Sequence, residues 1–171
     1  ILITSVVYGL QILQSLYIPY DFMTAYLGLI PWFVATKGFV WQIFTYMFLH
    51  GSPMHLFLNM YGIFIFGIMV EEAWGSKKFI LYYLFCGTGA GISIFLLNLI
   101  MGGSAYYAPT IGASGAMFGL LPPAAASALL AAELYTPLSV LTMGLCALLV
   151  FQPVQAHDWS VRWCPSSLRA H

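Results

Sequence analysis

The sequence predicts an all-α polytopic membrane protein. Of its 171 residues, 61% are hydrophobic and 6% are charged, and the mean hydropathy is +0.91. A chain of this composition has too few polar side chains to cover itself with a surface suited to water. Windows of about 20 residues, the length of one membrane span, give five apolar segments, at roughly 1–19, 53–71, 78–101, 114–134 and 136–151.

The residues between these candidate spans are expected to belong to the same membrane domain, residues 1–151. Residues 20–49 are too long for a turn, and they carry aromatic residues such as Trp32 and Trp41 that suit the headgroup layer. We expect this stretch to be an interfacial, partly helical insert. The chain opens on Ile1 without a charged region or a cleavage site, so we interpret its first segment as a trimmed span rather than a signal peptide.

Charge and cysteine usage exclude several classes of partner. Five Lys and Arg residues balance five Asp and Glu residues, which leaves no basic surface for nucleic acid. The three cysteines, Cys86, Cys146 and Cys164, lie far apart and form no paired metal or redox motif. We therefore expect no metal and no cofactor, and we expect the partners to be the lipid bilayer and other membrane proteins.

A polar cluster opens the second apolar segment, in the sequence "FLHGSPMHLFLNM". Ser52 followed by Pro53 predicts the start of a helix. His50 then lies just outside this helix, whereas His55 and Asn59 are four residues apart and share one of its faces. An unpaired amide in this setting costs on the order of 1–3 kcal/mol, so Asn59 is expected to have a partner.

Structural interpretations of this cluster are open. Asn59 could bond a neighbouring helix, and His55 could bond a backbone carbonyl near the interface. A metal site is less well supported, because no Asp, Glu or Cys stands nearby to complete a ligand shell. A functional site is favoured because polar groups within a membrane usually mark one, and because a second polar cluster follows.

The second cluster is "TIGASGAMFG", at the start of the fourth apolar segment. Ser114 is expected in or near the first helical turn, where unpaired backbone N–H groups and the positive end of the helix dipole suit a developing oxyanion. Gly112 and Gly115 would let a substrate carbonyl approach the backbone. Taken alone, the motif is also compatible with helix packing, because Gly115 and Gly119 form a face of small residues.

The order of the spans predicts that the two clusters meet. Successive spans run in opposite directions, so the second and fourth begin on the same side of the membrane and the fifth ends there. Ser114 is therefore expected at a depth similar to that of His55 and Asn59. By the same parity, Ala156 and His157 arrive on that side.

The residues "HGSPMHLFLN" followed by "GASG" resemble the rhomboid intramembrane serine proteases, whose second span carries H-x4-H-x3-N and whose fourth carries GxSG. The resemblance runs from about residue 41 to residue 120 and implies a rhomboid-like helical bundle. It implies that Ser114 is the nucleophile and that His50 is a structural histidine, with Gly112 and Gly115 completing the serine motif. The oxyanion would be bound by His55, Asn59 and the backbone N–H groups of Ala113 and Ser114.

In this family a histidine on a sixth span is the general base, and it forms a dyad with the serine. A serine needs such a base within hydrogen-bonding reach to become a nucleophile at neutral pH. His157 is the candidate base of this chain, because it follows Ala156 as the family pattern requires. His171 is the fallback.

The sequence departs from the family after Leu121. Pro122 and Pro123 are expected to interrupt the fourth span. Charged residues such as Asp158 make residues 152–171 unsuited to a sixth span. We therefore expect five apparent spans, followed by an aberrant or disordered tail. Our hypothesis is that the region after residue 121 is a reading-frame error or an aberrant terminus.

The leading hypothesis is an intramembrane serine endopeptidase that cleaves transmembrane helices of membrane-protein substrates. The cleaved segment would need small or helix-breaking residues, because its carbonyl must leave a helical hydrogen bond to reach the serine. The alternative is a catalytically inactive rhomboid-like pseudoprotease that binds membrane helices without cleaving them. The expected location is a bacterial inner membrane.

Overall fold

The computed structural model describes residues 1–18 and 21–132, and this part of the chain is helical apart from its loops and one isolated β-bridge. Two of its helices are long and apolar enough to cross a membrane, with 22 and 26 residues. In chain order the elements are α1 (Leu2–Tyr17), α2 (Phe22–Leu27), α3 (Pro31–Lys37), α4 (Gln42–Thr45), η1 (Tyr46–Phe48), α5 (Pro53–Trp74), α6 (Ser76–Met101), η2 (Ser104–Tyr106) and α7 (Ser114–Ala132).

The all-α membrane fold is confirmed for the described residues. The second and third predicted spans correspond to the two long helices, α5 and α6, and the fourth begins with α7. The first is the shorter apolar helix α1. The fifth span, at 136–151, and the predicted tail, at 152–171, lie outside the described residues, so the number of spans stays a prediction.

Helix α5 begins where the sequence predicts. The side-chain oxygen of Ser52 accepts a hydrogen bond from the His55 N–H at 3.1 Å, and Pro53 occupies the first helical position. The helix ends at Gly75, whose φ of +80° is in the region that favours glycine, and α6 starts immediately after it. Four charged residues gather at this junction: Glu71, Glu72, Lys77 and Lys78.

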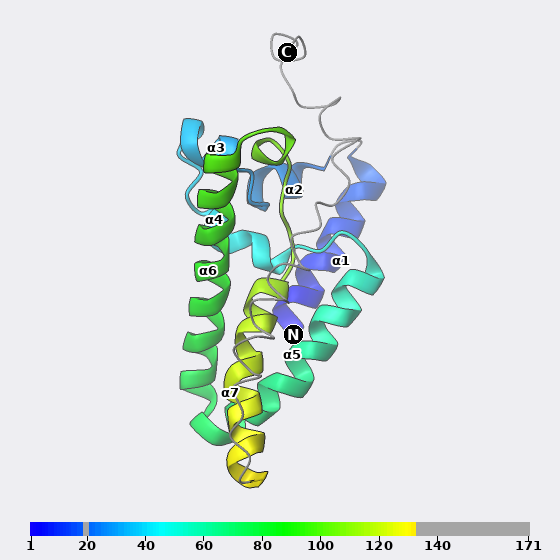
Figure 1. Ribbon diagram of the computed structural model, residues 1–171. Helices are drawn as coiled ribbons and strands as arrows, with labels where there is room; N and C mark the ends of the chain where they lie inside the picture. Colours follow the sequence, from blue (N-terminus) through cyan, green and yellow to red (C-terminus); the bar gives the residue numbers. More distant parts are fainter. Residues whose placement is uncertain (19–20, 133–171) are drawn as a thin grey trace.

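Helix α7 packs against both α5 and α6 and lies between them (Figure 1). Glycines make this close approach possible. A methyl group on Gly115 would lie 2.6 Å from the Cβ of Ala90, and one on Gly119 would lie 2.5 Å from the Cβ of Cys86. The two glycines predicted as a small-residue face therefore do form one, against α6, in the way that membrane helices commonly associate.

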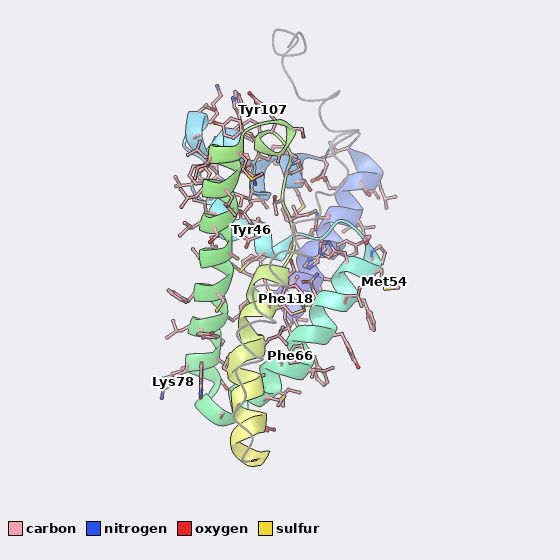
Figure 2. The ribbon with its side chains drawn as sticks, in the orientation of Figure 1. Tyr46, Met54, Phe66, Lys78, Tyr107 and Phe118 are labelled. Atoms are coloured by element: carbon pink, nitrogen blue, oxygen red, sulfur yellow. The ribbon has the colours of Figure 1, made fainter. Side chains whose placement is uncertain are left out.

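Large apolar side chains cover the outside of the bundle. Phe57 on α5 is 60% exposed, and Phe85 on α6 is 74% exposed. Met54 points away from the bundle at the start of α5, and Lys78 lies at the opposite end of the molecule from Tyr107 (Figure 2). An outer surface of this kind suits contact with lipid chains, with the charged side chains at the ends of the helices.

In the described part of the insert, residues 21–49, short helices alternate with loops, and polar side chains hold this part together. Gln42 is fully buried: its Nε2 donates to the backbone oxygens of Ala25 and Tyr26, and its Oε1 accepts from the Ile30 N–H. Thr45 donates to the Leu27 carbonyl at 2.6 Å. The interfacial location of this insert stays a prediction.

The predicted interruption at Pro122 and Pro123 is wrong, because α7 continues as a helix to Ala132. A proline at position 123 deprives the carbonyl of Gly119 of its normal helical donor. The hydroxyl of Tyr82, on α6, donates to that carbonyl at 3.1 Å. A side chain from a neighbouring helix thus replaces the backbone donor that is missing at Pro123 and stabilises the helix there.

We expect Tyr82→Phe to lower the free energy of unfolding by about 1 kcal/mol, because it leaves the Gly119 carbonyl without this donor. The measurement is thermal or denaturant unfolding in detergent. Tyr61→Phe is the matched control, since Tyr61 is 55% exposed on α5. Equal stability of the two variants would contradict the role given to Tyr82.

Candidate active site

The two polar clusters of the sequence meet at Gly112. Its backbone N–H donates to the Tyr46 carbonyl at 3.0 Å, and its φ is +124°. A methyl group at this position would lie 2.8 Å from Nε2 and Cε1 of His55 and 3.9 Å from the Ser114 hydroxyl oxygen. The imidazole of His55 and the hydroxyl of Ser114 therefore both lie close to the same glycine, in the region where the parity of the spans predicts that they meet.

Ser114 is the first residue of α7, which places it where the sequence predicts. The preceding residue, Ala113, is fully buried. In the part of the chain that the structure describes, the N–H groups of Ala113 and Ser114 have no backbone acceptor. Unpaired amides at the positive end of a helix dipole are suited to binding an oxygen that carries negative charge.

Asn59 lies one turn below His55 on α5 and is 4% exposed. Its Nδ2 donates to the His55 carbonyl at 2.8 Å, which uses one of the two hydrogens of that amide nitrogen. Its Oδ1 is buried and has no hydrogen-bond partner among the described residues. The predicted partner of Asn59 is therefore present for its amide nitrogen, and it lies on the same helix.

His50 lies in the loop before α5 and is 2% exposed. Its ring packs edge-on against that of His55, with 4.9 Å between the centroids. Neither ring nitrogen has hydrogen-bond geometry to a described residue. Burial lowers the pKa of His50 to about 4, the neighbouring His55 contributes to the decrease, and a backbone contact at Phe48 opposes it. His50 is therefore neutral at pH 7.

Two residues near the site were missed by the sequence analysis. Gln11, on α1, accepts a hydrogen bond at its Oε1 from the His50 N–H at 3.0 Å. A glutamine within an apolar segment needs a partner, so its presence in the first segment was an available signal. Tyr46 binds Gly112 through its backbone carbonyl, and no local pattern distinguishes it from the other aromatic residues of the insert.

The candidate bases, His157 and His171, lie outside the described residues, so the second half of the dyad stays a prediction. Among the residues that the structure describes, no group of three or more His, Cys, Asp and Glu side chains gathers in a way that could hold a metal ion.

Comparison with known proteins decides the family. The family model for the Rhomboid domain matches residues 37–170. This chain belongs to the rhomboid family. The match continues to residue 170, so the family likeness extends well beyond residue 121, where the sequence analysis places its end.

Curated rhomboid proteins of plants and bacteria resemble the chain. The mitochondrial RHOMBOID-like protein 6 of Arabidopsis thaliana is 34% identical over 142 residues, which cover 81% of this chain and 41% of that protein. The Rhomboid protease GluP of Bacillus subtilis is 36% identical over 85 residues, which cover 50% of this chain and 15% of that protein. The chloroplastic Rhomboid-like protein 11 of Arabidopsis thaliana is 39% identical over 80 residues, which cover 47% of this chain and 26% of that protein. This rhomboid chain spans about two-fifths or less of these relatives. No solved structure matches it.

The buried, neutral state of His50 makes the stability of this rhomboid pH-dependent. Between the ordinary pKa of about 6.5 and the folded pKa of about 4, the unfolded chain binds a proton that the folded chain does not. The contribution of His50 to the free energy of unfolding therefore has its full value above pH 6.5 and decreases as the pH falls toward 4. We expect a slope of roughly 1 kcal/mol per pH unit from this residue, measured as the free energy of unfolding in detergent.

His50→Phe keeps an aromatic ring of similar size and should reduce this slope. His55, His157 and His171 are present in both proteins, so the difference between the two pH profiles is assigned to the replacement of His50. Identical pH profiles would show that the imidazole of His50 becomes protonated in the folded protein as readily as in the unfolded one.

Proposed function

We propose that this chain is an intramembrane serine protease that cleaves transmembrane helices of membrane proteins by a Ser-His dyad. The observation that carries the proposal is the meeting of Ser114 and His55 at Gly112, at the N-terminus of α7. Membership of a family that includes a protein named as a protease supports it. Ser114 is the nucleophile, and His157 is the base.

The reaction follows from the chemistry of these groups. The base takes the proton of the Ser114 hydroxyl as its oxygen attacks the carbonyl carbon of the scissile peptide bond. The carbonyl oxygen acquires negative charge in the tetrahedral intermediate. It is stabilised by the N–H groups of Ala113 and Ser114 and by the side chains of His55 and Asn59. The base then gives its proton to the leaving amine, and water hydrolyses the acyl-serine ester.

The position of the serine restricts the substrate. A peptide bond within a membrane helix is hydrogen-bonded to its own helix and becomes accessible only where that helix unwinds. The proposed substrates are therefore membrane proteins with small or helix-breaking residues near the cleaved bond. The matched relatives include mitochondrial and chloroplastic proteins, so they give no support to the expected bacterial inner membrane, while a multi-pass membrane location follows from the family.

We expect Ser114→Ala to abolish cleavage of a model transmembrane substrate and labelling by a fluorophosphonate probe, because the nucleophilic oxygen is removed. The control is Ser93→Ala, which removes an exposed serine hydroxyl from α6. This variant should be labelled by the probe and should cleave the substrate as the wild type does. Cleavage by Ser114→Ala would contradict the proposal. A wild-type protein that folds but neither labels nor cleaves would favour the pseudoprotease that binds membrane helices.

A fourth expectation concerns Asn59 as an oxyanion donor. Asn59→Ala should lower kcat by about 10²–10³ with little change in KM, because the interaction forms mainly in the transition state. Asn98→Ala is the matched control: Asn98 is also nearly buried, and its Nδ2 donates to the carbonyl four residues earlier, on α6. If both variants lose stability and retain normal specific activity, Asn59 has a packing role.

A further inference from the structure

Tyr46 connects three parts of the molecule that are far apart in sequence. It is the first residue of η1 and is 2% exposed. Figure 2 shows it beside α6, near the start of α7. Its backbone carbonyl accepts the N–H of Gly112 at 3.0 Å, and its hydroxyl donates to the Gly87 carbonyl of α6 at 2.8 Å.

The same side chain also contacts the residue after the nucleophile. A methyl group on Gly115 would lie 3.2 Å from the Tyr46 hydroxyl oxygen. Tyr46 therefore reaches the serine motif on both sides of Ser114, through its carbonyl at Gly112 and through its hydroxyl at Gly115. The bond from the hydroxyl to Gly87 fixes this arrangement to α6, the long helix against which α7 packs.

We propose that Tyr46 is a positioning residue for the Ser114 nucleophile and for the oxyanion-binding amides beside it. This inference rests on the proposed protease function. The hydroxyl holds the ring of Tyr46 against α6, and the carbonyl of the same residue then holds Gly112 in its positive-φ conformation next to His55. Loss of the hydroxyl would let the loop at residues 112–114 shift relative to the base and to the oxyanion donors of α5.

The tyrosine-to-phenylalanine change is a clean way to remove this contact. A carbonyl oxygen can accept two hydrogen bonds, and Gly87 lies within α6, so its helical acceptor role remains after the hydroxyl is removed. The phenyl ring keeps the apolar contacts that Tyr46 makes with Leu29, Val34 and Met47 in the core. Tyr46→Phe is therefore expected to fold.

The competing explanation is that Tyr46 has a purely structural role. Comparison with Tyr82→Phe distinguishes this role from a positioning role. Both tyrosines donate a hydroxyl to a glycine carbonyl on a membrane helix, over 41 and 37 positions of sequence. Only Tyr46 contacts Gly112 and Gly115. A loss of stability is therefore common to both changes, whereas a change in the geometry around Ser114 is expected from Tyr46→Phe alone.

The experiment measures the second-order rate constant for fluorophosphonate labelling of Ser114 at a temperature at which the wild type and both variants are folded. We expect Tyr46→Phe to label about 10-fold to 100-fold more slowly, because a small misplacement of a reacting group has an effect of this size. Tyr82→Phe should label at the wild-type rate. Wild-type labelling by Tyr46→Phe, or equal slowing in both variants, would overturn the proposal.

Amide hydrogen exchange of the peptide that contains residues 110–117 gives a readout that does not require activity. Tyr46→Phe should increase exchange at Gly112, and Tyr82→Phe should leave it unchanged. If the wild type is not labelled, the protease function fails, and exchange alone then decides whether Tyr46 positions this loop. Unchanged exchange in Tyr46→Phe would overturn that role.

Discussion

The architecture depends on one requirement: the non-helical backbone that leads into α7 has to be hydrogen-bonded within the protein. This segment runs from the end of α6 to the start of α7 (Figure 1). Lipid offers no donors or acceptors, so irregular backbone at membrane depth is stable only where protein groups pair with it. Thr110 exchanges two hydrogen bonds with Leu29, and Gly112 donates to Tyr46. The insert between α1 and α5 supplies both partners.

This requirement explains why a long insert accompanies a site at the start of α7. The insert is itself irregular, and Gln42, Thr45 and Trp41 bond its backbone carbonyls with their side chains. Gln11 of α1 binds the backbone of His50 where the insert ends. A continuous set of hydrogen bonds thus runs from α1 through the insert to the loop that carries Gly112.

Local sequence signals predicted much of this fold. Ser52 and Pro53 marked the start of α5, Ser114 marked the start of α7, and span parity placed His55 and Ser114 together. These features depend on neighbouring residues or on the order of the spans, both of which can be inferred from a single sequence. The assignment of their catalytic roles came from the family resemblance and stays a prediction.

The features that could not be predicted depend on contacts between distant residues. The helix through Pro123 is one example, because the donor that replaces its missing N–H comes from Tyr82 on another helix. Tyr46 is another, since its hydroxyl partner is 41 positions away. A proline is itself a local signal that a helix is interrupted. No pattern in the neighbouring sequence shows that a side chain from another helix will replace the missing backbone N–H.

The hydrogen bonds from α1 have a consequence for how substitutions are tolerated. Gln11 accepts from the backbone of His50, and Gln14 accepts from the backbone of Met23. Every residue other than proline has a backbone N–H, so neither bond depends on the side chain at position 23 or 50. The two glutamines have no such freedom, because only a side-chain oxygen at the correct reach can accept. Mutational sensitivity at these two contacts is therefore one-sided: it lies in the two glutamines of α1, whereas positions 23 and 50 can change their side chains and keep their hydrogen bonds to α1.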